Sequence, residues 1–247
     1  MEIFFEIHKD IPREGPGDNK STREAFKMLK KLPKNSKILD VGCGPGMQTI
    51  ELAKNTDGII YALDNHDKFL DHLKNKAKKE NLDNKIQMIS GSMFTLDKYF
   101  KKEELDLIWA EGSIYIIGFK EGIENWKPFL KKGGYLVASE ISWLKDNIPK
   151  EIKEYWGFEY PTMKNIENNL DVIKKCGYKI IDHFTIPESS WFDNYYDPLE
   201  ERVSNLYKIH KGNKEWEEAI NMQIEEIEMY RKYSVYYGYV FYIMQKA

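Results

Sequence analysis

The chain has 247 residues, which suits one domain with an insertion and is enough to bury about 70–75% of the surface of the unfolded chain. Its 37 basic and 40 acidic residues nearly cancel, and the formal net charge of −3 argues against the basic surface of a nucleic-acid binder. Two cysteines, Cys43 and Cys176, fit no zinc pattern, so we expect free thiols, a reducing compartment and a cytoplasmic protein.

The sequence predicts no membrane span. Glu2, Glu6 and His8 interrupt the apolar start, unlike a signal peptide. The longest late apolar run, residues 235–244, is too short to cross a bilayer as a helix.

Residues 12–18 are rich in proline and glycine, which is typical of a loop. A capping box of Ser21 and Glu24 then predicts the start of a helix that ends before Pro33.

Three alternating glycines follow the first predicted strand. Residues 37–41 form this strand, with Asp40 near its end, and Gly42, Gly44 and Gly46 lead into an apolar helix. Glycine allows a positive φ and lets a ligand approach the main-chain N–H groups of such a turn. A dinucleotide fingerprint would need glycine at position 47, where Met47 stands, and the Walker lysine is absent too.

Asp64 ends the second predicted strand, the apolar run 58–63, and lies twenty residues past Gly44. An acid at this distance suits ribose hydroxyls. The alternative role, the N-cap of a helix over about 67–79, stays open.

Strand and helix patterns alternate through the rest of the chain. Strands are predicted at 86–89, 105–110, 135–141, 178–186 and 236–244, and helices at 121–130 and 162–176. This order predicts an α/β three-layer sandwich on a mostly parallel sheet.

The strand, its acid and the alternating glycines resemble motif I of the class I S-adenosylmethionine (SAM) methyltransferases, acid-x-Gly-x-Gly-x-Gly. The resemblance covers residues 36–186 and the last strand, and is greatest to small-molecule enzymes of the ubiquinone/menaquinone-biosynthesis type. It implies a Rossmann-like sheet of seven strands, the last antiparallel, with SAM as cofactor, S-adenosylhomocysteine as product and no metal. The implied cofactor-binding residues are Gly17, Asp40, Gly42, Cys43, Gly44, Gly46, Asp64, Asn65, Ser92, Met93 and Glu111. Ser92 departs from the family, which usually has an acid there to hold the adenine.

We expect one domain: an N-terminal lid segment (1–35), a cofactor-binding core (36–186), a helical cap insertion (187–233) and a return strand (234–247). The insertion is predicted to contain an aromatic loop, residues 191–199, and two helices. It can reach the carboxyl ends of the strands, so we predict an acceptor pocket that includes Ser113, Tyr115, Trp191 and Tyr195. The same aromatics also suit core contacts or the subunit contacts of a homodimer, and this alternative stays open.

Methyl transfer needs a base only when the acceptor must lose a proton. Glu111, His183 and Tyr195 are weak candidates, because Glu111 also suits a solvated loop and His183 a structural position in a strand. We expect in-line transfer to a small-molecule acceptor, with no nucleic-acid partner. A methyltransferase acting on protein or RNA, or a SAM-binding protein without turnover, stays open.

Overall fold

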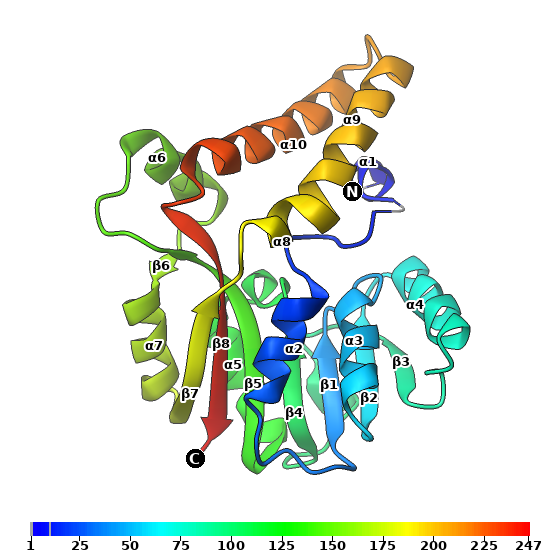
Figure 1. Ribbon diagram of the computed structural model, residues 1–247, viewed down its shortest axis with the longest axis vertical. Coiled ribbons are helices and arrows are strands. Elements are labelled where there is room, and N and C mark those ends of the chain that lie inside the picture. The colour runs from blue at the N-terminus through cyan, green and yellow to red at the C-terminus, as the bar shows by residue number, and fades with distance from the viewer. Residues whose placement is uncertain (1, 10) are drawn as a thin grey trace.

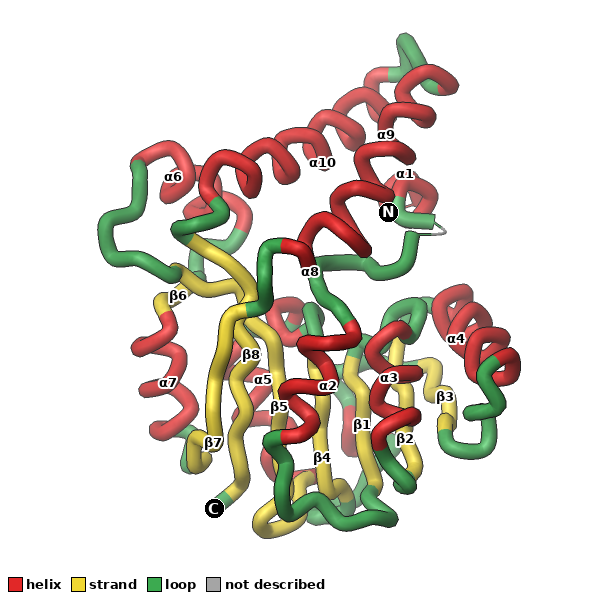
Figure 2. The backbone as a smooth tube through the Cα atoms, viewed as in Figure 1, coloured by secondary structure: helices red, strands yellow, loops and turns green. Residues whose placement is uncertain are grey.

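The computed structural model describes residues 2–9 and 11–247. Its centre is one mixed sheet in the order β3-β2-β1-β4-β5-β8-β7 (Figures 1 and 2). The strands on this path are β1 (Lys37–Val41), β2 (Ile59–Asp64), β3 (Ile86–Ser90), β4 (Leu105–Ala110), β5 (Leu130–Trp143), β7 (Tyr178–Thr185) and β8 (Tyr237–Lys246).

The pairings between β1, β2, β3, β4 and β5 are parallel, whereas β8 is antiparallel to both β5 and β7. This confirms the predicted sheet with its antiparallel last strand. The structure adds an eighth strand, β6 (Lys164–Asn165), which pairs with the end of β5.

Helices cover both faces of the sheet, which makes the predicted three-layer sandwich. On one face lie α2 (Asn19–Lys27), α3 (Met47–Asn55) and α4 (Asp67–Lys79), and on the other lie α5 (Phe119–Trp126) and α7 (Ile166–Lys175) (Figure 1). Each face has its own apolar core: Ile38 and Trp109 belong to the first, and Leu39 and Ile108 to the second. Adjacent residues of one strand thus enter opposite cores, as the pleat requires. Short 3₁₀ turns complete the connections: η1 (Leu96–Lys98), η2 (Ile114–Ile116) and η3 (Lys127–Phe129).

The insertion forms a helical cap above the carboxyl edge of the sheet (Figure 1). It contains α8 (Ser189–Trp191), a π-helical turn η4 (Phe192–Tyr196), α9 (Asp197–Ile209) and α10 (Lys214–Tyr233). Two elements from elsewhere in the chain join it. The helix α1 (Glu2–Ile7) packs on α9 and α10, and α6 (Lys150–Glu159) is bound to α10 through Glu151, which accepts hydrogen bonds from Lys232 and Tyr233.

Three local predictions were wrong. The N-cap of α2 is Asp18 and not Ser21, because the Asp18 carboxylate accepts from both the backbone N–H and the hydroxyl of Ser21. The aromatic residues expected as a loop are helical from Ser189 onward. The helix expected from position 162 begins only at Ile166, after β6, and is capped by Asn165.

Candidate active site

Two of the three motif glycines face a cavity at the carboxyl ends of the strands. Gly42 and Gly44 have φ values of +69° and +52°, which favour glycine. The N–H of Gly42 donates to the carbonyl of Leu63 over 2.8 Å, which ties the turn to β2. The cavity, named the strand-end cavity here, has a volume of about 260 Å³. Its lining includes Gly42, Gly44, Asp64, Asn65, Ser92, Met93 and Ser113.

The third glycine, Gly46, has a different task. It is the N-cap of α3 at φ +85°, and a Cβ atom there would lie 2.3 Å from Cδ1 of Leu73. Because Gly46 has no side chain, Leu73 of α4 can pack against the turn. Gly46 lines none of the cavities described here, so the prediction that it touches the cofactor is not supported by its position.

Asp40 and the thiol of Cys43 lie behind the glycine turn and away from the strand-end cavity. Asp40 is fully buried, accepts a hydrogen bond of 2.6 Å from Thr49, and burial raises its pKa to about 7. Burial also raises the pKa of the Cys43 thiol, whose side chain belongs to the core. Asp40 thus holds α3 against β1. The carbonyl of Cys43 accepts a hydrogen bond from Nε2 of Gln48 over 2.9 Å.

Asp64 stabilises two loops at once. One carboxylate oxygen accepts from the N–H of Gly44 and the other from the N–H of His66, each over 2.9 Å. The N-cap of α4 is His66, so the interpretation of Asp64 as this cap is wrong. Asp64 lines the strand-end cavity with Asn65 beside it, which leaves the ribose role as a prediction.

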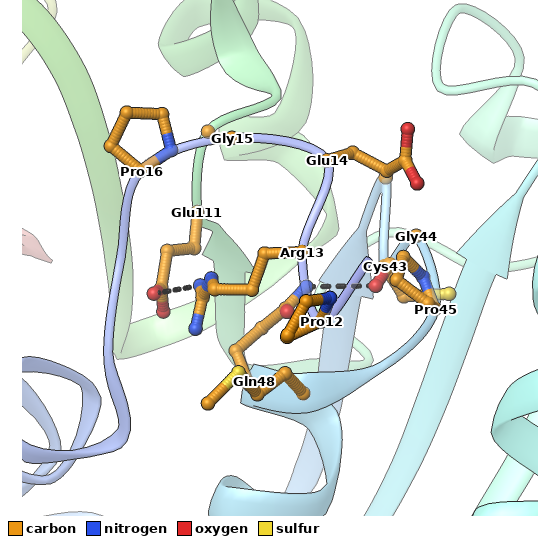
Figure 3. Close-up of a pocket in the computed structure, with 13 residues that line it drawn as sticks. Pro12, Arg13, Glu14, Gly15, Pro16, Cys43, Gly44, Pro45, Gln48 and Glu111 are labelled. Atoms are coloured by element: carbon orange, nitrogen blue, oxygen red, sulfur yellow. Dashed lines mark hydrogen bonds and ion pairs between the residues drawn. The ribbon is translucent and has the colours of Figure 1, made fainter. Parts of the chain in front are cut away.

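The proline- and glycine-rich segment 12–16 crosses in front of the glycine turn, and a smaller space of about 50 Å³, the turn cavity, lies between them (Figure 3). Figure 3 shows Arg13 directed toward Glu111 and Glu14 directed to the opposite side of the segment. Arg13 and Glu111 form an ion pair in which the two side chains are 5% and 1% exposed. The Nη1 atom of Arg13 is buried and has no hydrogen-bond partner among the described residues.

Glu111 is fully engaged in these contacts. Besides Arg13, its carboxylate accepts from the hydroxyl of Thr22 over 3.0 Å and from Nε1 of Trp109 over 3.1 Å. This arrangement positions Arg13 and leaves Glu111 poorly placed to remove a proton from an acceptor. The structure therefore argues against Glu111 as a base.

Glu14 lies at the centre of the site. It lines the strand-end cavity, the turn cavity and a third cavity beneath the cap. Burial, with the negative charge of Asp64 nearby, raises the pKa of Glu14 to about 8. Its Oε2 atom has no hydrogen-bond partner among the described residues.

The third cavity, named the cap cavity here, has a volume of about 350 Å³. Tyr115, Trp191 and Tyr195 line it, so three of the predicted acceptor residues lie together. Trp191 is also a core residue, because its ring stacks on Tyr230 with centroids 3.9 Å apart. Ser113 lines the strand-end cavity instead, and its hydroxyl donates to the carbonyl of Val41 over 2.5 Å. Its predicted place in the acceptor pocket is therefore not supported.

Two further base candidates are unsuitable. His183 lies on β7, where it pairs with Tyr242 of β8. Its side chain is exposed and lines none of the cavities described here. Tyr195 is 5% exposed, and burial raises its pKa far above the ordinary value, so its phenol stays protonated.

The sequence predicted Gly17 as the cofactor-binding residue of this segment, whereas residues 12–16 line the turn cavity and Gly17 does not. Gly17 donates its N–H to the carbonyl of Ser190 over 2.9 Å and thereby attaches the segment to the cap. Arg13 and Glu14 were missed. The available signal was a pair of charged residues inside a segment otherwise made of proline and glycine.

Within residues 2–9 and 11–247, no group of three or more His, Cys, Asp or Glu side chains is arranged to hold a metal ion. None of the helices in that part of the chain has the length and apolar character needed to span a bilayer.

Residues 32–233 match the family model for a methyltransferase domain, which is more than half of the chain. The chain belongs to the methyltransferase domain family. Among curated proteins, it is similar to sterol 24-C-methyltransferase from Debaryomyces hansenii, with 30% identity over 160 residues. That alignment covers 60% of this chain and 41% of the relative, so the chain spans less than half the length of that protein.

Solved structures have the same fold. A SAM-dependent methyltransferase from Geobacter sulfurreducens, in complex with S-adenosyl-L-homocysteine, superposes with a TM-score of 0.84 at 16% identity, covering 100% of this chain and 98% of that one. One from Thiobacillus denitrificans, with the same ligand, gives 0.84 at 17% identity and covers 100% and 99%. This agreement extends over the cap as well as the sheet.

Proposed function

We propose that this methyltransferase binds SAM in the strand-end and turn cavities and methylates a small-molecule acceptor held in the cap cavity. The observation that carries the proposal is the junction of the cavities. The strand-end and cap cavities share Phe4, Glu14, Gly112 and Tyr115, so ligands in the two would meet at these residues. In an open α/β sheet, ligands bind beyond the carboxyl ends of the strands, where this junction lies.

The residues present fit the cofactor. Asp64 is placed to accept hydrogen bonds from ribose hydroxyls, and Ser92 and Met93 to contact an adenine ring. At the turn cavity, the buried and unpartnered Nη1 of Arg13 suits the carboxylate of the methionine part. We assign Glu111 the role of holding this guanidinium in place.

When bound, SAM supplies a methyl group made electrophilic by its sulfonium. The chain contributes position, since aligning two reactants can be worth roughly 7–11 kcal/mol. Trp191 and Tyr195 close the cap cavity against water. For an acceptor that must lose a proton, the Oε2 atom of Glu14 can take it, because this oxygen lies between the two cavities and its pKa of about 8 is close to neutral pH.

The size of the cap cavity favours a small molecule over a protein or RNA. Its volume of about 350 Å³ is within the range of small-ligand pockets. The two free cysteines support our proposal of a cytoplasmic location. Trp191 and Tyr195 are buried within one chain, so we propose no homodimer built on them.

Calorimetry with SAM and an acceptor screen with methyl-labelled SAM test the proposal. Gly44→Val adds a branched side chain at the ligand-facing turn and is expected to abolish SAM binding. Gly212→Val is the matched control: Gly212 has φ +86°, with nothing within 4 Å of an added Cβ, and lies in the turn between α9 and α10. Equal SAM affinity in both variants would contradict the proposed site, and SAM binding without any labelled product would favour a binding protein.

A further inference from the structure

The lining of the cap cavity has one sign of charge. Four glutamates line it, Glu14, Glu159, Glu225 and Glu226, and the described lining residues include no lysine or arginine. They come from three parts of the chain: the segment 12–16, the end of α6, and α10. Burial raises the pKa of Glu14 to about 8 and that of Glu226 to about 7, and a cation bound beside them favours the charged form of both. A cavity with this lining repels an anionic ligand and attracts a cation.

The wall between the carboxylates is aromatic. Eight aromatic side chains line the cavity: Phe4, Tyr115, Tyr155, Trp156, Tyr160, Trp191, Tyr195 and Tyr239. The rings of Tyr115 and Tyr160 meet edge to face with centroids 6.4 Å apart, and Trp191 and Tyr239 lie 5.4 Å apart. Aromatic faces attract cations, above all organic ammonium groups, and an aromatic enclosure is the usual site for such a group.

Hydrogen-bond acceptors without partners add a third, independent observation. Gln223 is 8% exposed and lines the cavity, and its Oε1 atom has no partner among the described residues. The same holds for Oε2 of Glu14, and among the donors of the lining, Nε1 of Trp156 and Nε1 of Trp191 likewise have no partner among the described residues. Buried acceptors of this kind are uncommon, because each lacks the donor that water would otherwise supply. An organic cation that also carries an N–H or O–H group supplies donors to the acceptors of this lining.

From these observations we infer that the acceptor is a small organic cation, a protonated amine, held by the glutamates and aromatic rings of the cap cavity. The ammonium nitrogen has no lone pair, so the deprotonated carboxylate of Glu14 first takes its proton, and the neutral amine then displaces S-adenosylhomocysteine from the methyl group. The inference rests on the proposed function for the statement that this ligand is the methyl acceptor. Glu226 is the main counter-charge: its carboxylate is fixed by a hydrogen bond of 3.0 Å from the hydroxyl of Tyr196.

The inference can be tested with two probes of equal shape. Choline carries a quaternary ammonium, and 3,3-dimethylbutan-1-ol replaces that nitrogen with a neutral carbon. Calorimetry on the full chain saturated with S-adenosylhomocysteine compares their affinities, since the saturating ligand occupies the cofactor site. We expect choline to bind about tenfold more tightly or better, as cation–π and charge attraction favour it.

Two variants connect this preference to the cavity. Glu226→Gln keeps an acceptor for Tyr196 and removes one charge, and should reduce the choline preference at least about threefold. Glu228→Gln removes the same charge from an exposed position on the same helix, outside the cavity, and should leave the preference unchanged. If Glu226→Gln fails to fold, Tyr155→Leu, which removes an aromatic wall, replaces it with the same expectation.

Equal binding of the two probes, a preference for the neutral one, or no binding of either overturns the inference. So does a preference that Glu228→Gln lowers as much as Glu226→Gln. A chain that binds SAM but shows one of these results keeps the proposed function and loses only the acceptor class. A chain that does not bind SAM, but selects choline when calorimetry is done without S-adenosylhomocysteine, keeps the cation site and loses its assignment as an acceptor site.

Discussion

The buried ion pair between Arg13 and Glu111 gives the sharpest test of how the segment 12–16 is held against β4. Replacing Glu111 with glutamine keeps the shape of the side chain and removes its charge. Arg13 stays buried, since its side chain is only 5% exposed. The new amide N–H₂ group faces a donor in either orientation: Arg13 in one, and the hydroxyl of Thr22 with Nε1 of Trp109 in the other.

Removing one partner of a buried pair costs about 3–5 kcal/mol, because the remaining charge is left without compensation. Against a total free energy of unfolding of about 5–15 kcal/mol, this is a large loss. Arg13→Met removes the other charge. In the double variant Arg13→Met/Glu111→Gln no uncompensated charge remains, so it should be more stable than the sum of the single effects predicts, by at least about 2 kcal/mol.

Urea denaturation of the wild type, both single variants and the double variant measures this coupling free energy. Additive effects, within about 0.5 kcal/mol, would refute the argument that the pair is closed to water and couples the lid segment to β4. So would a Glu111→Gln variant that loses less than about 1 kcal/mol.

Three further predictions follow from single contacts. Gly46→Ala places a Cβ atom against Leu73 at φ +85° and should lower the free energy of unfolding, measured by urea denaturation, by about 2–5 kcal/mol. Adding Leu73→Ala should recover part of this loss. A Gly46→Ala variant with wild-type stability would contradict the packing role of Gly46. Asp64→Ala removes hydrogen bonds to a charged group and should weaken SAM binding by about 10- to 150-fold in calorimetry, whereas unchanged affinity per folded molecule would exclude the ribose role. Burial raises the pKa of Glu140 to about 8, so between pH 4.5 and 8 the unfolded chain loses this proton while the folded chain keeps it, and the stability of the wild type falls as pH rises. Glu140→Gln should therefore gain stability relative to the wild type from pH 5 to pH 8, by up to about 1.4 kcal/mol per pH unit. A stability difference that stays constant over this range would contradict the raised pKa.

The sequence predicted those parts of the fold that depend on neighbouring residues. The alternating glycines and the apolar runs located β1, β2 and the turn. Both signals are local: a positive φ favours glycine at that position, and a strand buried on both faces is a continuous apolar run. The same local pattern could not separate Gly44, which lines the strand-end cavity, from Gly46, which does not. That difference depends on Leu73, which reaches the turn from another helix.

Contacts between distant segments were beyond sequence reasoning. Arg13 and Glu111 are 98 positions apart, and neither carries a local signal for the other. Asp40 looked like a ligand contact because it stands beside the glycines, but strand alternation directs it to Thr49 and the core. The cap shows the same limit: its aromatic residues predicted a pocket and core contacts equally well, and Trp191 contributes to both.

Several buried polar atoms without partners among the described residues lie at the cavities around the segment 12–16. Native interiors satisfy nearly all such groups, because each unpartnered one costs about 1–3 kcal/mol. Several of those in this chain lie on side chains that line the strand-end, turn or cap cavities: Arg13, Glu14, His66, Trp156, Trp191 and Gln223. Donors and acceptors are both present, with the guanidinium of Arg13 on one side of the segment and the carboxylate of Glu14 on the other. A zwitterionic amino-acid group beside a cationic centre would match this order of charges. Under the proposed function, Arg13 would hold the cofactor and Glu14 would face the acceptor.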